Sequence, residues 1–218
     1  VIVLIFSFRL KESLSVENRL QGSIFSTFLT FGVIIKNRLF MSYVGIQSFL
    51  LGSMFAYIAA SPFIFQSFYG LSAFVFSLCF GANGAALVIG ANVGGKLPNR
   101  QALAIGVLAF VVAALYTIAV LIIQPYWLFI EIGFFAMLLL MGITFPAISS
   151  LAMESERQYA GSASALLGFA PFFLGGVVSP LVGIGNIFYS TALVILACNV
   201  LALAIYWMVR HKIPNSAE

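Results

Sequence analysis

The sequence predicts an all-α fold in which a polytopic bundle of six helices crosses a membrane. Only 7% of the 218 residues are charged and 62% are hydrophobic, whereas soluble domains carry about 25% charged residues. The apolar runs are about 20 residues or longer and lack strand alternation, which favours helices over a β-barrel. The basic residues fall only between these runs. In lipid the backbone must satisfy its own polar groups, and a helix does so within one segment.

The positions of the ten Lys and Arg residues predict the orientation of the spans. They occupy alternate gaps between the apolar runs: Arg9, Lys11, Arg19, Lys36 and Arg38 before the first, Lys96 and Arg100 after the second, Arg157 after the fourth, and Arg210 and Lys212 after the sixth. Short loops rich in Lys and Arg stay in the cytoplasm. We therefore expect a cytoplasmic linker and C-terminus, and we interpret the net charge of +4 as a topology signal rather than a nucleic-acid surface.

The N-terminal 38 residues divide into two segments. Residues 1–8 are apolar but too short to span, and no basic residues precede them as they would in a signal peptide. We interpret them as the end of a truncated preceding transmembrane helix, which makes this chain the C-terminal part of a longer protein. Residues 9–38 form the linker, and within it apolar side chains recur at helical spacing: Ile24, Phe25, Phe28, Phe31 and Ile35. This spacing predicts an amphipathic helix lying in the membrane interface.

The six-helix transmembrane bundle is predicted over residues 39–210, with residues 211–218 as a cytoplasmic tail. The spans are expected at residues 40–65, 71–94, 102–123, 126–152, 160–184 and 187–209. Turn residues separate several of them: Gly70, Pro98-Asn99, Pro125 and Gly185-Asn186. Because the connections are short, successive spans are predicted to be antiparallel neighbours.

Glycine and proline divide the spans into two groups of three. The second span of each group is rich in glycine, the third has one or none, and the first carries Pro62 or Pro146 near its C-terminal end. Three is odd, so the second group enters the membrane from the opposite side, which predicts two inverted three-helix repeats. The repeat places the first two spans of each group inward, with close packing through small residues. The aliphatic third spans are expected on the lipid-facing rim.

Six residues are candidates for helix packing or hinge motion. The prolines bend helices and free backbone carbonyls, and three of the glycines recur every seven residues on one span. The set is Pro62, Pro146, Gly161, Gly168, Pro171 and Gly175. Pro171 lies near the middle of its span and is the best hinge candidate.

Catalysis is not expected. The chain contains no Asp, and its one histidine, His211, lies in the C-terminal tail. Aspartate pairs, Ser–His pairs and clusters of metal ligands are therefore impossible within the spans. We expect no enzyme activity, no cofactor and no metal.

Glu131 is the one Asp, Glu, Lys, Arg or His residue inside a predicted span. A charge at the bilayer centre costs about 2.5–3.5 kcal/mol on insertion scales, and such residues are functional candidates. Two interpretations remain open. Glu131 follows Tyr126 closely enough to reach the outer interface, or it titrates or meets a cationic substrate in a cavity, as a possible proton or cation site.

Further cavity candidates are uncharged residues on the spans that the repeat places inward. Polar members can instead form interhelical hydrogen bonds, and apolar members can instead pack in the core. Aromatic and Met side chains in such a cavity suit apolar, chemically varied ligands. With Glu131 the substrate-binding candidates are Gln47, Met54, Phe55, Tyr57, Ser61, Asn83, Glu131, Phe169 and Phe172.

Four strings of the sequence are distinctive: FAYIAASPFIF at 55–65 followed by Tyr69-Gly70, FGAN at 80–83, AGSASALLG at 160–168 and SPLVG at 179–183. They resemble one transporter family, the Bcr/CflA drug-resistance branch of the major facilitator superfamily. Together they cover nearly the whole chain as the last six helices of twelve. Residues 95–100, GKLPNR, resemble a decayed copy of the basic loop motif of the superfamily, without its acidic residue.

The resemblance implies the C-terminal half of a proton-coupled antiporter of the bacterial inner membrane. Such a protein exports drugs or other small amphipathic molecules by alternating access. Its partners would be that substrate, protons, the lipid bilayer and an N-terminal six-helix half that is missing here, with no nucleic acid. Two alternatives keep the membrane bundle: export of a small metabolite, or a non-transporting half-protein that acts through a partner.

Overall fold

The computed structural model describes residues 30–213. Six long helices joined by short connections make up most of this part of the chain. In chain order the elements are α3 (Arg38–Pro62), the π-helix η2 (Phe63–Phe68), α4 (Ala73–Gly94), α5 (Asn99–Ile123), α6 (Trp127–Ser155), the 3₁₀ turn η3 (Arg157–Tyr159), α7 (Ala160–Val182) and α8 (Ile187–Val209). Each of the six long helices is apolar enough to cross a membrane, and η2 extends the span of α3 to Phe68. The predicted all-α fold and its six spans are confirmed. The expectation that all successive spans are neighbours is wrong for α3–α4 and α4–α5, because α4 packs on α6 and α3 packs on α7 and α8 instead.

The helix boundaries follow from capping residues in the sequence. The side chains of Asn37 and Asn186 each accept two backbone N–H bonds at the start of α3 and α8, and Ser72 accepts one at the start of α4. These bonds satisfy donors that have no partner within the helix. Gly70 and Gly185 adopt positive φ angles of 69° and 79°, a conformation that only glycine adopts without strain. Both residues were predicted as turns, and the chain reverses there because glycine allows the positive φ angle.

The π-helix after Pro62 was not predicted. Proline lacks an N–H and cannot bond to the carbonyl four residues earlier, which here belongs to Ile58. The hydroxyl of Ser61 donates to that carbonyl instead, at 3.3 Å. The ladder then continues with a longer register, and the Tyr69 amide donates to the Ile64 carbonyl at 3.1 Å. Pro62 thus changes the helix type at the end of the first span without ending the span.

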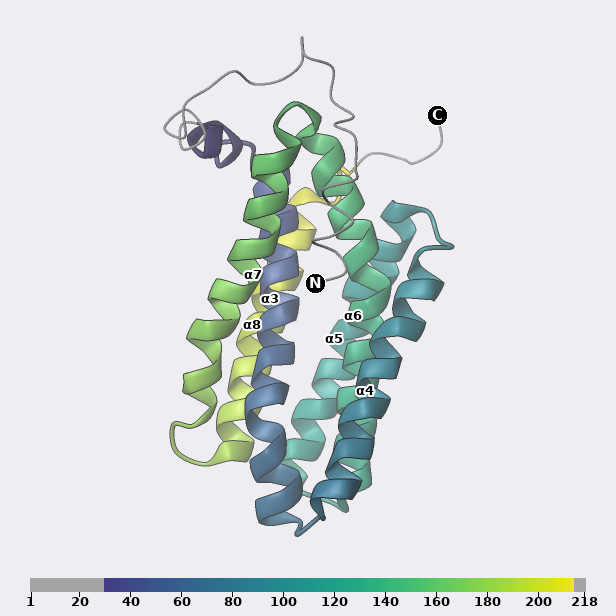
Figure 1. Cartoon of the computed structure of the whole chain (residues 1–218), viewed down its shortest axis with the longest axis vertical. Helices are drawn as coiled ribbons and strands as arrows, with labels where there is room; N and C mark the ends of the chain where they lie inside the picture. The colour runs from purple at the N-terminus through teal and green to yellow at the C-terminus, as the bar shows by residue number, and fades with distance from the viewer. Residues whose placement is uncertain (1–29, 214–218) are drawn as a thin grey trace, which may run out of the picture.

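The six helices form one bundle with their ends aligned (Figure 1). Helix α3 packs against α7 and α8, helix α6 packs against α4 and α5, and α5 and α8 also pack against each other. The connections that contain Lys or Arg lie at one end of the bundle, together with the start of α3 and the end of α8 (Figure 1). The connections without them lie at the other end. The charge alternation along the sequence therefore becomes a charge separation in space.

Helices α4 and α6 approach each other backbone to backbone through glycine. A Cβ atom at Gly90 would overlap the Leu139 carbonyl oxygen, and one at Gly142 would overlap the Leu87 carbonyl oxygen. In membranes, small residues allow such contacts and their dispersion energy. The expected small-residue packing of the second span is therefore present on one face of α4.

Burial within the six-helix body differs from the predicted sorting of spans between core and rim, which concerns the complete transporter and stays a prediction. The most apolar window of α4 is 22% buried and that of α7 is 28% buried, compared with 44% for α5 and 39% for α8. Helices α5 and α8 gain burial by packing on each other as well as on α6 and α3. In contrast, an added Cβ at Gly81, Gly161 or Gly168 would meet no atom within 4 Å. A row of small residues on one face of a helix therefore does not by itself predict which helix packs against it.

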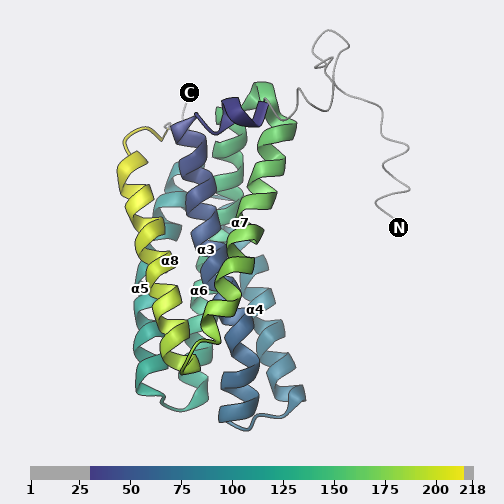
Figure 2. The ribbon, with the colours of Figure 1, turned by 90° about the vertical axis from the view of Figure 1, so that its left-hand side faces the viewer.

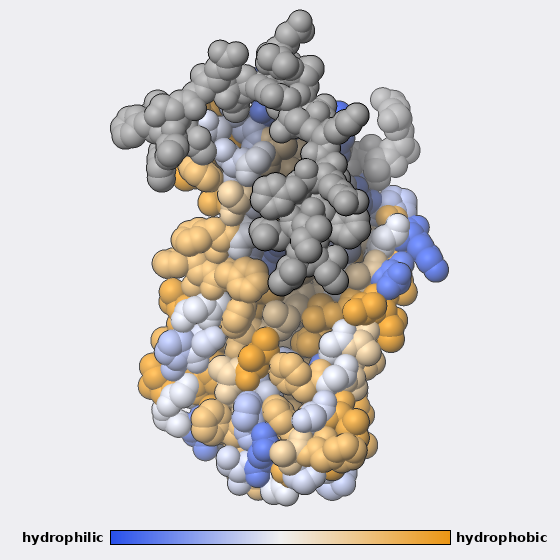
Figure 3. Space-filling view, viewed as in Figure 1, coloured by the Kyte–Doolittle hydropathy of each residue, from blue (hydrophilic) through white to orange (hydrophobic). Residues whose placement is uncertain are grey.

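Apolar side chains cover most of the visible flank of the bundle (Figure 3). Large exposed members include Phe74, Val88, Val112 and Met208, each more than 60% exposed. Exposed apolar surface on this scale requires an apolar solvent or partner. The described part of the linker contributes residues 30–34 as a short helix; the rest of the predicted amphipathic helix, and residues 1–8 and 214–218, lie outside the described residues.

Candidate functional site

Three polar residues from three helices meet inside the bundle. The Asn83 side chain on α4 donates from Nδ2 to the Tyr57 hydroxyl on α3 at 3.0 Å. The Asn83 amide also lies beside the Glu131 carboxyl of α6, and Tyr57 and Cys79 lie within electrostatic range of that carboxyl. Tyr57 is 2% exposed, Asn83 1% and Glu131 7%. We call Tyr57, Asn83 and Glu131 the polar triad.

The polar triad contains buried oxygen atoms without hydrogen bonds. Both carboxyl oxygens of Glu131 and the Oδ1 atom of Asn83 are buried, and none has a hydrogen-bond partner among residues 30–213. Each such group costs about 1–3 kcal/mol relative to a satisfied one, and more if it is charged. No Lys, Arg or His of the described residues forms an ion pair with Glu131. The structure therefore holds a carboxyl group and an amide oxygen ready to meet a proton, a cation or a donor.

Glu131 is buried among neighbouring helices, and both interpretations of its role stay predictions. The residue is 7% exposed, and its neighbours include Asn83 of α4 and Tyr57 of α3. The rings of Tyr57 and Phe134 pack on each other with centroids 4.7 Å apart. Glu131 is thus an interior residue of the bundle despite its closeness in sequence to Tyr126.

A cavity of about 200 Å³ lies next to the polar triad. Its walls come from α3, α4 and α6: Met54, Tyr57, Ile58, Phe80, Asn83, Gly84, Leu87 and Leu138. Three of the predicted candidates, Met54, Tyr57 and Asn83, are therefore neighbours in space. The lining is almost entirely apolar with a polar base, a composition suited to an amphipathic ligand.

Glu131 and the remaining candidates do not line this cavity. Phe55 contacts α7 instead: its ring meets Phe172 edge to face at 5.8 Å, and it fills the space over Gly175. Phe169 and Phe172 are 64% and 65% exposed, on the flank of the bundle. Ser61 is buried and bonded to Ile58, whereas Gln47 is half-buried with its side-chain oxygen unpaired among the described residues.

The packing and hinge candidates also separate. Helices α6 and α7 continue as α-helices through Pro146 and Pro171, and only Pro62 changes the helix type. Of the three glycines spaced by seven, Gly175 alone contacts another helix within the described residues. The hinge role of Pro171 remains a prediction.

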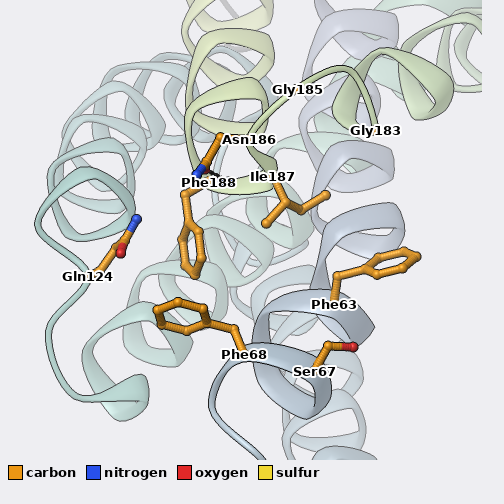
Figure 4. A pocket seen from close by; sticks show the side chains of 9 residues that line it. All are labelled: Phe63, Ser67, Phe68, Gln124, Gly183, Gly185, Asn186, Ile187 and Phe188. Atoms are coloured by element: carbon orange, nitrogen blue, oxygen red, sulfur yellow. Dashed lines mark hydrogen bonds between the residues drawn. The ribbon is translucent and has the colours of Figure 1, made fainter.

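A larger cavity, about 550 Å³, lies at the end of the bundle without basic residues, and sequence reasoning missed it. It is formed by the end of the first span, the end of α5 and the α7–α8 turn (Figure 4): Phe63, Ser67, Phe68, Gln124, Gly183, Gly185, Asn186, Ile187 and Phe188. The Phe68 and Phe188 rings meet edge to face with centroids 4.7 Å apart. Its residues come from three distant turns, so no local pattern could have located it.

Tyr69 joins two turns at this same end of the bundle. Its hydroxyl donates to the Pro125 carbonyl at 2.5 Å, and burial raises the pKa of Tyr69 above its ordinary value.

We expect Tyr69→Phe to lower the free energy of unfolding by about 1 kcal/mol, measured as thermal unfolding of the purified protein. Since the folded state holds this proton more tightly, wild-type stability should fall above about pH 10, and less so in the variant. Tyr126→Phe, at an exposed residue, should change neither property.

Comparison with known proteins places this architecture in a family. The sequence profile described as the Major Facilitator Superfamily matches residues 1–180, which include the polar triad and five of the six long helices. The chain belongs to the Major Facilitator Superfamily. As a member of that superfamily with six apolar spans, it is a multi-pass membrane protein with the fold of half a transporter.

Two superfamily proteins are similar to this chain. It is 37% identical over 190 residues to the MFS-type transporter YdgK of Bacillus subtilis, covering 85% of this chain and 47% of that protein. It is 26% identical over 222 residues to a bicyclomycin resistance protein homolog of Haemophilus influenzae, covering 94% of this chain and 53% of that protein. The chain thus spans about half the length of the curated relatives that it matches. The predicted membership of the superfamily is confirmed, and the relatives include a bicyclomycin resistance homolog at low identity.

Proposed function

We propose that this chain forms the C-terminal half of a proton-coupled exporter of drugs or other small amphipathic molecules. The observation that carries the proposal is an apolar cavity lined in part by Tyr57 and Asn83, the polar neighbours of the buried, unpaired Glu131 carboxyl. Apolar walls accept the body of an amphipathic molecule, and one carboxyl can hold either a proton or the cationic end of a substrate. The similarity to a bicyclomycin resistance homolog supports drugs as one substrate class.

The exposed face made by α4 and α7 is proposed to contact the N-terminal six-helix half. Both helices lie on the side opposite α5 and α8 (Figures 1 and 2), and they are the two least buried spans. Their exposed surface combines large residues such as Phe74 and Phe173 with glycines that have no neighbour. Rocking of one half against the other over this face would open the cavity to alternate sides of the membrane.

The proposed location is the bacterial inner membrane, with the linker and the C-terminus in the cytoplasm. The separation of charge supports this orientation, since Lys36, Lys96, Arg157 and Lys212 belong to connections at one end of the bundle. Short basic loops are retained on the cytoplasmic side. The large cavity beside Phe188 would then face outward.

Proton exchange is proposed to occur at Glu131. A buried carboxylate without a cation is costly, so the site favours a state in which Glu131 carries a proton or contacts a positive group. The Asn83 amide can turn from its bond with Tyr57 toward the carboxylate when the proton leaves. A cationic substrate and a proton would then exclude each other at one carboxyl group, which is the requirement for antiport.

Expression of the full-length gene in an efflux-deficient bacterium tests the proposal. We expect resistance to several drugs of the panel, loss of export when the proton gradient is collapsed, and release of protons when substrate is added to everted vesicles. Export that persists without the gradient would rule out proton coupling. Absence of any drug effect, with gradient-dependent export of a metabolite, would favour the second transport interpretation.

A further inference from the structure

We infer that a cavity between the start of α5 and the end of α8 binds the phosphate of an anionic phospholipid. The cavity has a volume of about 390 Å³ and is lined by Arg100, Ala104, Tyr206, Arg210, His211 and Ile213. Two guanidinium groups, an imidazole and a phenol therefore converge from two helices that are distant in the sequence. This chemistry recognises a phosphate diester.

The charge of the cavity is not neutralised within the described residues. No acidic side chain lines it, and neither Arg100 nor Arg210 forms an ion pair with a carboxylate among residues 30–213. The three glutamates of that range, Glu131, Glu154 and Glu156, all belong to α6 or its end. Basic pockets between helices at the cytoplasmic membrane surface are suited to anionic lipid headgroups.

Arg210 is held in place by its neighbours. Its guanidinium lies over the Trp207 ring, 3.7 Å from the centroid, a cation–π contact that orients the group. Its Nε donates to Nε2 of His211 at 3.3 Å. That bond leaves the terminal nitrogens of the guanidinium for a ligand, and it leaves the proton of a neutral His211 on Nδ1 as a further donor. Arginine in such a geometry can bind two phosphate oxygens at once.

The apolar surface that continues from the cavity favours a lipid over a free anion. By helical spacing, the exposed apolar residues on the side of the cavity are Leu108 and Leu115 on α5, which are 45% and 52% exposed, and Leu196 on α8, which is 37% exposed. Acyl chains of a lipid whose phosphate sits between Arg100 and Arg210 would lie along these side chains. Helices α5 and α8 face away from α4 and α7 (Figure 2), so the cavity stays open to lipid when the other half is bound. The inference requires the proposed membrane orientation but not a particular transported substrate.

Native mass spectrometry of the full-length protein tests the site, with phosphatidylglycerol, phosphatidylcholine and glycerol phosphate as probes. We expect wild-type protein to retain about one phosphatidylglycerol more firmly than phosphatidylcholine, and not to retain glycerol phosphate. Replacing both arginines, Arg100→Gln with Arg210→Gln, should weaken phosphatidylglycerol retention by about tenfold or more. Arg210→Lys keeps the charge and should lose only part of the retention, which guards against a double variant that fails to fold.

The matched control is Lys96→Gln with Arg157→Gln, which removes two positive charges at the same end of the bundle but outside the cavity. It should retain phosphatidylglycerol as the wild type does. Equal loss in the control would show that general surface charge holds the lipid, and equal retention of phosphatidylcholine would show that the arginines recognise no anion. Firm binding of glycerol phosphate would indicate a free-anion site instead. Each of these results overturns the inference and leaves the transport proposal to its own assay.

Discussion

Replacing Glu131 with Gln in the full-length protein is expected to abolish proton-coupled export while the protein still folds. Gln has nearly the same size but cannot release a proton or pair with a cation. Removal of a buried carboxyl without hydrogen bonds should leave stability unchanged or raise it by about 1 kcal/mol, because the amide can bond to Asn83. Loss of transport together with retained stability would show that the Glu131 carboxyl acts in transport and is not needed for packing. The measurements are substrate-induced proton release in everted vesicles and thermal unfolding in detergent.

Glu154→Gln provides the matched control for this experiment. Glu154 lies on the same helix, but it is exposed and paired with Arg157 at 3.0 Å, and exposed pairs contribute little. The control should transport at the wild-type rate and with the wild-type pH dependence. If Glu131→Gln also did so, Glu131 would have no part in coupling, and the coupling acid would belong to the other half. Superfamily membership does not depend on the outcome.

Replacing Gly90 with Ala is expected to destabilise the bundle more than any other single methyl group added to α4. The new Cβ would overlap the Leu139 carbonyl oxygen, which belongs to the backbone of α6 and cannot rotate away. The two helices must separate, and overpacking of this kind costs about 1–3 kcal/mol. Thermal unfolding of the purified protein and the yield of monodisperse protein would measure the loss.

Gly81→Ala is the control on the same helix. No atom lies within 4 Å of a Cβ at that position, and alanine favours helix over glycine by about 1 kcal/mol. The control should therefore be as stable as the wild type or slightly more stable. Equal stability of the two variants would contradict the close contact between α4 and α6. If Gly81→Ala instead reduced transport without reducing stability, that would support contact of this face with the N-terminal half.

The limits of sequence reasoning are clearest at particular residues. The positive φ of Gly70 and Gly185 could be anticipated because turn residues act locally. The π-helix after Pro62 could not, since it depends on where the freed carbonyl finds a donor. Gly81 and Gly90 are both glycines of the same span, yet only a Cβ at Gly90 would meet the backbone of a neighbouring helix. Tyr57 and Asn83 are separated by 26 residues, and no periodicity indicates that their side chains touch.

The sequence by itself determined the number of spans, their helical class and the end of the bundle at which the basic residues gather. These properties follow from the lengths of apolar runs and the cost of exposing backbone or charge to lipid, which act on each segment separately. Only the tertiary structure decided which face of each span is covered, and that Glu131 is buried beside Asn83. Those properties depend on the rotation and separation of helices, which packing sets between segments far apart in the chain.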